Sequence, residues 1–271
     1  MKVQKCPLIT NPHDPRFRSL RFLQTPRGRS ETGQYVIEGI RHLARAVHQQ
    51  ASIQSVFFEP SVLVNPFGQK LARQLRRRGV PAMRLTLSLY MRLTLAAEPQ
   101  GIGATLRQQW TTTSRLHVGP NTIWLALESI ESPGNLGTII RTAEAAGVEG
   151  IFLLGEQGDP YHPAAVRASM GSLFAQRLIR CSVREFADWA RSNGVCIVGS
   201  SPGGLMDYEG LRYSWPAALL VGSEKKGLSE LATETARFVV RIPMHGHCDS
   251  VNVAVATGVV LFEMSSQRAI P

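Results

Sequence analysis

The chain has 271 residues, and 44% of them are hydrophobic, which is enough for one large or two ordinary domains with a buried core. It carries 30 Lys and Arg against 20 Asp and Glu, so its net charge is +10 and its isoelectric point is about 10. This excess is typical of proteins that bind a polyanion, most often nucleic acid. A basic protein without such a partner has the same composition, so charge alone leaves both open.

Cysteine spacing and hydropathy narrow the class of protein further. The four cysteines lie far apart and form no C-x-x-C pair, which argues against a disulfide framework or a zinc ribbon and favours the reducing, cytoplasmic compartment. The longest apolar run, from Val253 to Phe262, is too short to span a bilayer. The first residues contain no apolar segment of the kind that a secretory signal needs.

The first 30 residues form a basic leader with seven Lys and Arg and a single acid, Asp14. A mobile or RNA-contacting arm is one interpretation, and a solvated, partly ordered leader fits equally well. Pro7, Pro12, Pro15 and Pro26 argue against the amphipathic helix of a transit peptide, because proline interrupts helices.

From residue 34 to 107, strand and helix patterns alternate, which predicts an α/β domain with a mainly parallel or mixed sheet. Arg76–Arg78 resemble an RNA-binding patch, yet cations in the last turn of a helix before Gly79 also suit the helix dipole. Strands are predicted at 35–37, 53–58, 81–85 and 102–106, and helices at 40–48, 71–78 and 87–93.

Residues 108–121 are polar and lack periodicity, so we expect a linker between domains 1–107 and 122–271. The second domain is predicted to be a doubly wound parallel sheet with helices on both faces. Strands are predicted at 122–127, 150–154, 174–179, 195–198, 217–221 and 238–242, and helices at 137–146, 164–170, 183–192, 229–236 and from about 252.

Three polar segments follow strands of this second domain, where open α/β folds bind their ligands. The first runs from Ser132 to Thr142 and contains Asn135 and Arg141. By themselves, Asn135 is explained as a helix N-cap and Arg141 as a surface partner of Glu144.

The second segment is Gly222-Ser223-Glu224-Lys225-Lys226-Gly227, between a strand and a helix. Its glycines permit a tight turn or a close approach of the backbone to a ligand. The pattern is neither a dinucleotide fingerprint nor a phosphate-binding P-loop.

The third segment runs from Ile242 to Val253. Ser250 and Asn252 precede an apolar helix, so capping alone explains them. His245, His247 and Cys248 lack the spacing of a zinc site, and we predict no metal there.

In this order, the three segments resemble the motifs of the SpoU/TrmH family of RNA 2′-O-ribose methyltransferases. The N-x-G-x-x-x-R motif corresponds to Asn135, Gly137 and Arg141, and G-x-E-x-x-G to Gly222, Glu224 and Gly227. The third motif, I-P-M…S-L-N-V-S, corresponds to Ile242–Met244 and Ser250–Ala254, with Val251 in place of Leu and Ala254 in place of Ser.

The amino-terminal part is similar to the L30e/L7Ae-like RNA-binding domain that many members carry, through Gly33–Gly39 and Glu98–Gly101. Length and layout resemble the ribosomal-RNA branch, including the thiostrepton-resistance type, more than the tRNA branch. The alternatives are a tRNA methyltransferase or a non-catalytic RNA-binding protein that kept the fold. A small-molecule Rossmann enzyme is disfavoured by charge and motif.

The resemblance implies a trefoil-knotted α/β domain, S-adenosylmethionine as cofactor, and a homodimer formed through this domain. It places the backbones of Gly222, Ile242, Met244 and Val251 at the cofactor. It places Asn135, Arg141, Glu224, Ser250 and Asn252 in the reaction centre.

The resemblance makes Arg141 the general base. Because a guanidinium stays protonated at ordinary pH, holding a phosphate and the developing alkoxide is the alternative role. For Glu224 we expect that it fixes loop geometry rather than transferring protons.

Overall fold

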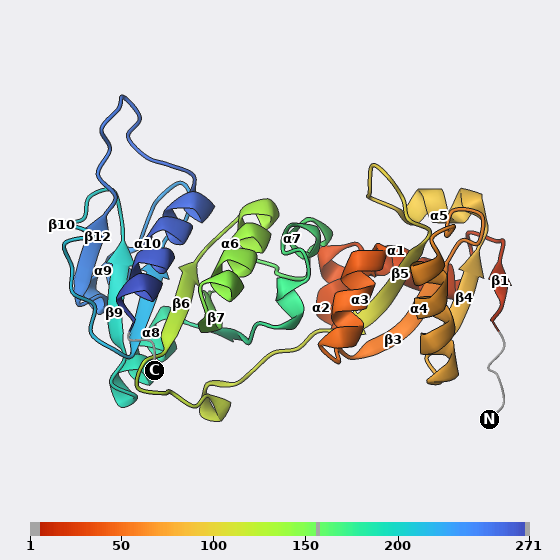
Figure 1. Cartoon of the computed structure of the whole chain (residues 1–271), viewed down its shortest axis with the longest axis horizontal. Helices are drawn as coiled ribbons and strands as arrows, with labels where there is room; N and C mark the ends of the chain where they lie inside the picture. The colour runs from red at the N-terminus through yellow and green to blue at the C-terminus, as the bar shows by residue number, and fades with distance from the viewer. Residues whose placement is uncertain (1–5, 156–157, 269–271) are drawn as a thin grey trace. The chain divides into compact units, whose positions relative to one another are not determined.

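The computed structural model describes residues 6–155 and 158–268, which divide into two compact units (Figure 1). Unit 1 comprises the chain up to Gln108 together with Tyr161–Phe174. Unit 2 comprises Gln109–Pro160 and the chain from Ala175 onward. Each unit has its own sheet.

Unit 1 contains a mixed five-stranded sheet in the order β1-β4-β3-β5-β2. Neighbouring strands β1, β4 and β3 are parallel, whereas β5 is antiparallel to both β3 and β2. This arrangement confirms the predicted mixed α/β unit. The strands are β1 (Leu8–Ile9), β2 (Gln34–Glu38), β3 (Ile53–Phe58), β4 (Ala82–Leu85) and β5 (Ile102–Arg107).

Helices α1 and α5 share a hydrophobic cluster with the sheet of unit 1, whereas α3 packs against β2, β5 and α4. Helix α7 lies in the part of unit 1 that follows the first stretch of unit 2 along the chain, and it packs against β2. The helices are α1 (Pro15–Leu23), α2 (Pro26–Thr32), α3 (Ile40–His48), α4 (Pro66–Arg77), α5 (Leu87–Leu93) and α7 (Pro163–Ala168), with a 3₁₀ turn η2 (Ser172–Phe174).

The basic leader is ordered from Cys6 onward, so the mobile-arm interpretation is wrong for that stretch; Lys2 and Lys5 lie outside the described residues. Pro15 and Pro26 begin α1 and α2 rather than preventing helix formation, because the first helical position needs no N–H donor. The side chains of the preceding residues cap both helices. The apolar face of α1 is buried through Phe17, Leu20 and Leu23.

Unit 2 contains a seven-stranded sheet in the order β10-β12-β9-β11-β6-β7-β8, and every neighbouring pair is parallel. This confirms the predicted doubly wound parallel sheet. The strands are β6 (Ile123–Glu128), β7 (Val148–Leu154), β8 (Leu178–Cys181), β9 (Cys196–Ser200), β10 (Met206–Asp207), β11 (Ala217–Val221) and β12 (Phe238–Arg241).

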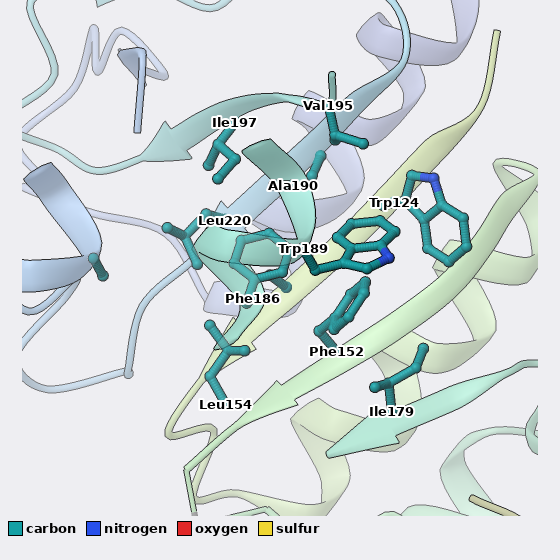
Figure 2. Packing of buried hydrophobic residues seen from close by; sticks show 13 residues of the cluster. Trp124, Phe152, Leu154, Ile179, Phe186, Trp189, Ala190, Val195, Ile197 and Leu220 are labelled. Atoms are coloured by element: carbon teal, nitrogen blue, oxygen red, sulfur yellow. The ribbon is translucent and has the colours of Figure 1, made fainter. Parts of the chain in front are cut away.

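Helices cover both faces of this sheet. On one face, α8 (Val183–Ser192) and α9 (Glu230–Thr235) enclose an aromatic cluster, shown in Figure 2. There the ring of Trp189 lies 5.0 Å from that of Trp124 and 4.5 Å from that of Phe152, centroid to centroid. Helices α6 (Pro133–Ala145) and α10 (Val253–Gln267) pack against each other, and α10 contacts β9 and β11. A 3₁₀ turn, η1 (Thr113–Arg115), precedes the sheet.

The structure corrects several predicted boundaries. The strand predicted at 174–179 is displaced: Phe174 closes a 3₁₀ turn, with its N–H bonded to the carbonyl of Gly171, and β8 begins at Leu178. Helices α4 and α6 begin earlier than predicted, at Pro66 and Pro133. The short edge strand β10 was not predicted. No described helix is long and apolar enough to cross a membrane.

Because α1 is part of the core of unit 1, we predict that Phe17→Ala destabilises the protein by about 3–5 kcal/mol. Phe17 is only 2% exposed, so truncation leaves a cavity. The free energy of unfolding is measured by urea denaturation. The matched control is Arg18→Ala, next to it on the exposed side of α1, which should change stability little. Equal stability of both variants would contradict a packed leader.

Candidate functional site

Unit 2 contains a cavity of about 690 Å³ at the carboxyl ends of its central strands. This volume lies in the range of small-molecule sites, and the position is where doubly wound sheets bind ligands. Its walls come from the loops after β9, β11 and β12, the first turn of α10, and one residue of α6. The lining residues are Asn135, Ser200–Gly203, Val221–Gly227, Ile242, Met244, Asp249–Val253 and Ala256.

The loop after β11 is a tight turn that closes on itself. The N–H of Ser223 donates to the carbonyl of Gly227 at 2.9 Å, and the N–H of Gly227 donates back to Ser223 at 3.0 Å. Gly227 has a φ of +66°, which favours glycine. A Cβ at Gly222 would lie 2.1 Å from the carbonyl carbon of Gly227, so only glycine fits there.

The carboxylate of Glu224 is held by three donors from the start of α6. Its Oε1 accepts from the backbone N–H of Ser132 at 3.2 Å and from Nδ2 of Asn135 at 3.1 Å. Its Oε2 accepts from the backbone N–H of Glu131 at 3.1 Å. These bonds join the loop after β11 to the loop after β6.

A second amide continues this hydrogen-bond chain. Nδ2 of Asn252 donates to Oδ1 of Asn135 at 3.1 Å, while Oδ1 of Asn252 accepts from the N–H of Ala254 at 2.8 Å and caps α10. The explanation of Asn135 as a cap is wrong, since Ser132 caps α6 and Asn135 lies one turn further on. Its side chain is therefore available to link Glu224 with Asn252.

Opposing effects set the pKa of Glu224. Partial burial raises the pKa, but backbone N–H groups and the Asn135 amide donate to the carboxylate and favour its charged form. The net result is a pKa below the ordinary value of 4.5. Glu224 is therefore an ionised acceptor at neutral pH, with its oxygens already engaged.

The four positions expected at the cofactor all line the cavity: Gly222, Ile242, Met244 and Val251. Ser250 lines it too, and its Oγ donates to Oδ1 of Asp249 at 3.3 Å.

Arg141 is placed differently from the other expected reaction-centre residues. It is exposed on α6 and does not line the cavity. Within the described residues its side chain makes no hydrogen bond or ion pair, including none with Glu144. His245, His247 and Cys248 are exposed in the loop after β12 and also lie outside the lining.

Sequence reasoning missed part of this cavity. Ser200–Gly203, directly after β9, form one wall, and Lys225, Lys226 and Asp249 lie among the lining residues. The available signal was positional: β9 is the neighbour of both β11 and β12 in the sheet, so its carboxyl end must lie beside theirs.

Two family models match the chain. Residues 122–262 match the SpoU rRNA Methylase family, and residues 14–104 match an MRM3-like substrate binding domain. The first match covers the cavity and all three motifs, and the second covers most of unit 1.

Relatives of similar length agree with these models. An uncharacterized tRNA/rRNA methyltransferase from Synechocystis is 30% identical, over 96% of this chain and 94% of its own. A 23S rRNA (uridine(2479)-2′-O)-methyltransferase from Streptomyces viridochromogenes is 29% identical, over 89% and 85%.

Among solved structures, an AdoMet-bound rRNA methyltransferase from Sinorhizobium meliloti is similar with a TM-score of 0.86 and 33% identity, covering 95% of this chain and 96% of that one. Motifs, cavity and full-length matches agree, and the chain belongs to the SpoU rRNA methylase family.

Proposed function

We propose that this protein transfers a methyl group from S-adenosylmethionine to a ribose 2′-OH of RNA, with ribosomal RNA as the substrate. The observation that carries the proposal is the chain from Glu224 through Asn135 to Asn252, which joins the three motifs at one cavity. The 23S rRNA methyltransferase among the relatives supports ribosomal RNA over tRNA.

The residues of the cavity fit S-adenosylmethionine. The volume is adequate, and the N–H groups of Met244 and Val251 donate to no acceptor among the described residues, so they are free for a polar ligand. Together with the backbones of Gly222 and Ile242, they would hold the cofactor. When bound, S-adenosylmethionine supplies an electrophilic methyl group.

The protein's contribution is mainly positioning. Asn135, Ser250 and Asn252 offer amides and a hydroxyl that can orient the ribose 2′-OH within about 3 Å of the methyl carbon to be transferred, and such placement supplies much of a rate enhancement. Glu224 holds Asn135 in place rather than accepting a proton, since its oxygens already receive three donors.

We propose that Arg141 stabilises the developing alkoxide and an adjacent phosphate of the RNA. Its exposed position with no protein partner among the described residues suits contact with RNA bound over α6. A guanidinium that is always charged acts here by electrostatics rather than by taking the proton. As the bond from the 2′ oxygen to the methyl carbon forms and the bond from sulfur to that carbon breaks, the hydroxyl proton passes to solvent water.

The charge distribution supports unit 1 as the main RNA-binding part. Unit 1 carries 18 Lys and Arg against five Asp and Glu, whereas unit 2 carries 12 against 15. Net charges of +13 and −3 place the electrostatic attraction for a polyanion almost wholly on unit 1. An L30e-like RNA-binding role for this unit agrees with that charge.

We further propose the homodimer and the knot that the family resemblance implies. On α10, Val255 and Phe262 are 54% and 53% exposed, with Val259 between them on the same side of the helix, and such a stripe favours association through unit 2. Strand β12 lies between β10 and β9, and the helix after it, α10, contacts β9 and β11, so the chain after β12 returns towards the middle strands of the sheet. Free cysteines support a cytoplasmic setting.

We predict that Arg141→Ala lowers methyl transfer at least about 100-fold, because it removes stabilisation of the developing charge. S-adenosylmethionine binding, measured by calorimetry, should stay unchanged. The activity assay is transfer of labelled methyl to purified rRNA and tRNA, with mapping of the 2′-O-methyl position. Arg184→Ala, an exposed arginine on α8, is the control and should remain active. Full activity of Arg141→Ala would refute the assignment.

Glu224→Gln tests the hydrogen-bond chain. The amide presents one acceptor where the carboxylate presents two, so we expect a loss of about 1 kcal/mol in unfolding free energy at pH 7. Because the folded pKa is lowered, the carboxylate's stabilisation is present above about pH 4.5 and is lost as the pH falls through the folded pKa. Denaturation curves of wild type and variant should therefore converge in acid. A difference in unfolding free energy between wild type and variant that stays the same at every pH would contradict this role of Glu224.

Phe262→Asp tests the dimer. A charge at the carboxyl end of the apolar stripe should convert the dimer to monomer and reduce activity, with mass measured by light scattering. The control is Leu231→Asp on α9, an exposed leucine on the other face of the sheet, which should leave the mass unchanged. A wild-type monomer with full activity would exclude this dimer.

A further inference from the structure

The target ribose brings negative charge to the cavity of unit 2. Each ribose in RNA has a phosphate on either side, and the 3′-phosphate is attached at the carbon next to the one bearing the 2′-OH. When the 2′-OH lies in the cavity, a phosphate of the RNA must therefore lie close to the opening of the cavity. Yet Glu224 and Asp249 line the cavity, and unit 2 has a net charge of −3. A cation of the protein at the cavity mouth offsets this repulsion.

Among the described lining residues, only Lys225 and Lys226 are cationic, and they are the only lysines in unit 2. Lys225 is already paired, with its Nζ 3.0 Å from Oε2 of Glu131. The ammonium group of Lys226 has no hydrogen-bond or ion-pair partner within the described residues. Lys226 is thus the cation available to a ligand at this cavity.

The backbone that carries Lys226 is fixed before any ligand arrives. Its N–H donates to Oγ of Ser223 at 3.1 Å, and the paired hydrogen bonds between Ser223 and Gly227 close the turn around it. A fixed loop lowers the entropy cost of placing the ammonium on an anion. The side chain of Lys226 is exposed, so its ammonium group can reach a phosphate that lies in solvent. A strongly hydrated point charge is suited to such a contact.

We propose that Lys226 binds the RNA phosphodiester next to the methylated ribose and thereby positions the 2′-OH in the cavity. This rests on the proposed function, and it gives Lys226 a positioning role that differs from that of Arg141. Arg141 does not line this cavity, and its proposed role is to stabilise charge that develops in the transition state, whereas Lys226 binds the RNA before the reaction. The carboxylate of S-adenosylmethionine is the competing anion, and it is distinguished by experiment.

The test measures binding of the full-length protein to unmodified large-subunit ribosomal RNA, transcribed in vitro, at several salt concentrations. For Lys226→Gln we expect weaker RNA binding and a slope of log K against log salt that is smaller by about 0.7–0.9, the value for one phosphate contact. Lys226→Arg should restore the slope. Lys225→Gln should change the slope less, because the ammonium group of Lys225 is already paired with Glu131.

Affinity for S-adenosylmethionine is measured in parallel by calorimetry without RNA. An unchanged affinity in Lys226→Gln supports the phosphodiester, whereas a reduced affinity would overturn the proposal in favour of the cofactor's carboxylate. A wild-type salt slope in Lys226→Gln would also overturn it. Failure of the wild-type protein to methylate any RNA would instead refute the proposed function, and the salt slopes would still be read independently.

Discussion

The geometry of the site depends on one carboxylate, that of Glu224. It accepts from two backbone N–H groups and from the amide of Asn135, residues about 90 positions earlier in the chain. Asn135 in turn receives the amide of Asn252. Three loops that leave three different strands are thereby held in one arrangement by side chains too polar to pack as a core. Loss of this acceptor would remove three of the hydrogen bonds that join the loop after β11 to the start of α6.

The strands and the order of the motifs could be predicted because buried parallel strands are short, apolar and bounded by glycine or proline. The first residues of several helices could not be predicted in this way. Pro15 was interpreted as interrupting a helix, and the helices after Pro66 and Pro133 were predicted to begin several residues too late; all three prolines occupy a first helical position after a capping side chain. With the helix predicted from residue 137, Asn135 was explained as its cap, whereas α6 begins at Pro133 and Ser132 performs that role.

The site was predictable as far as the motifs extend, and no further. Gly222, Met244 and Val251 line the cavity as the resemblance implies, yet the wall formed by Ser200–Gly203 carries no motif and follows only from the strand order. Arg141 shows the opposite case: a residue identified by its motif that lies outside the cavity of its own chain. Sheet order is a tertiary property, and a local pattern does not encode it.

The assignment of Tyr161–Phe174 to unit 1 has a consequence for dissecting the protein. The chain passes between the units three times, so no single cut separates them. Within unit 1, the ring of Tyr161 lies 4.5 Å from that of Tyr35, and Arg167 donates to the carbonyl of Leu95 at 2.9 Å. An amino-terminal fragment that ends at the linker would lack these contacts, and a carboxy-terminal fragment would retain a segment without its packing partners. The sequence boundary between the two family matches is therefore not a folding boundary.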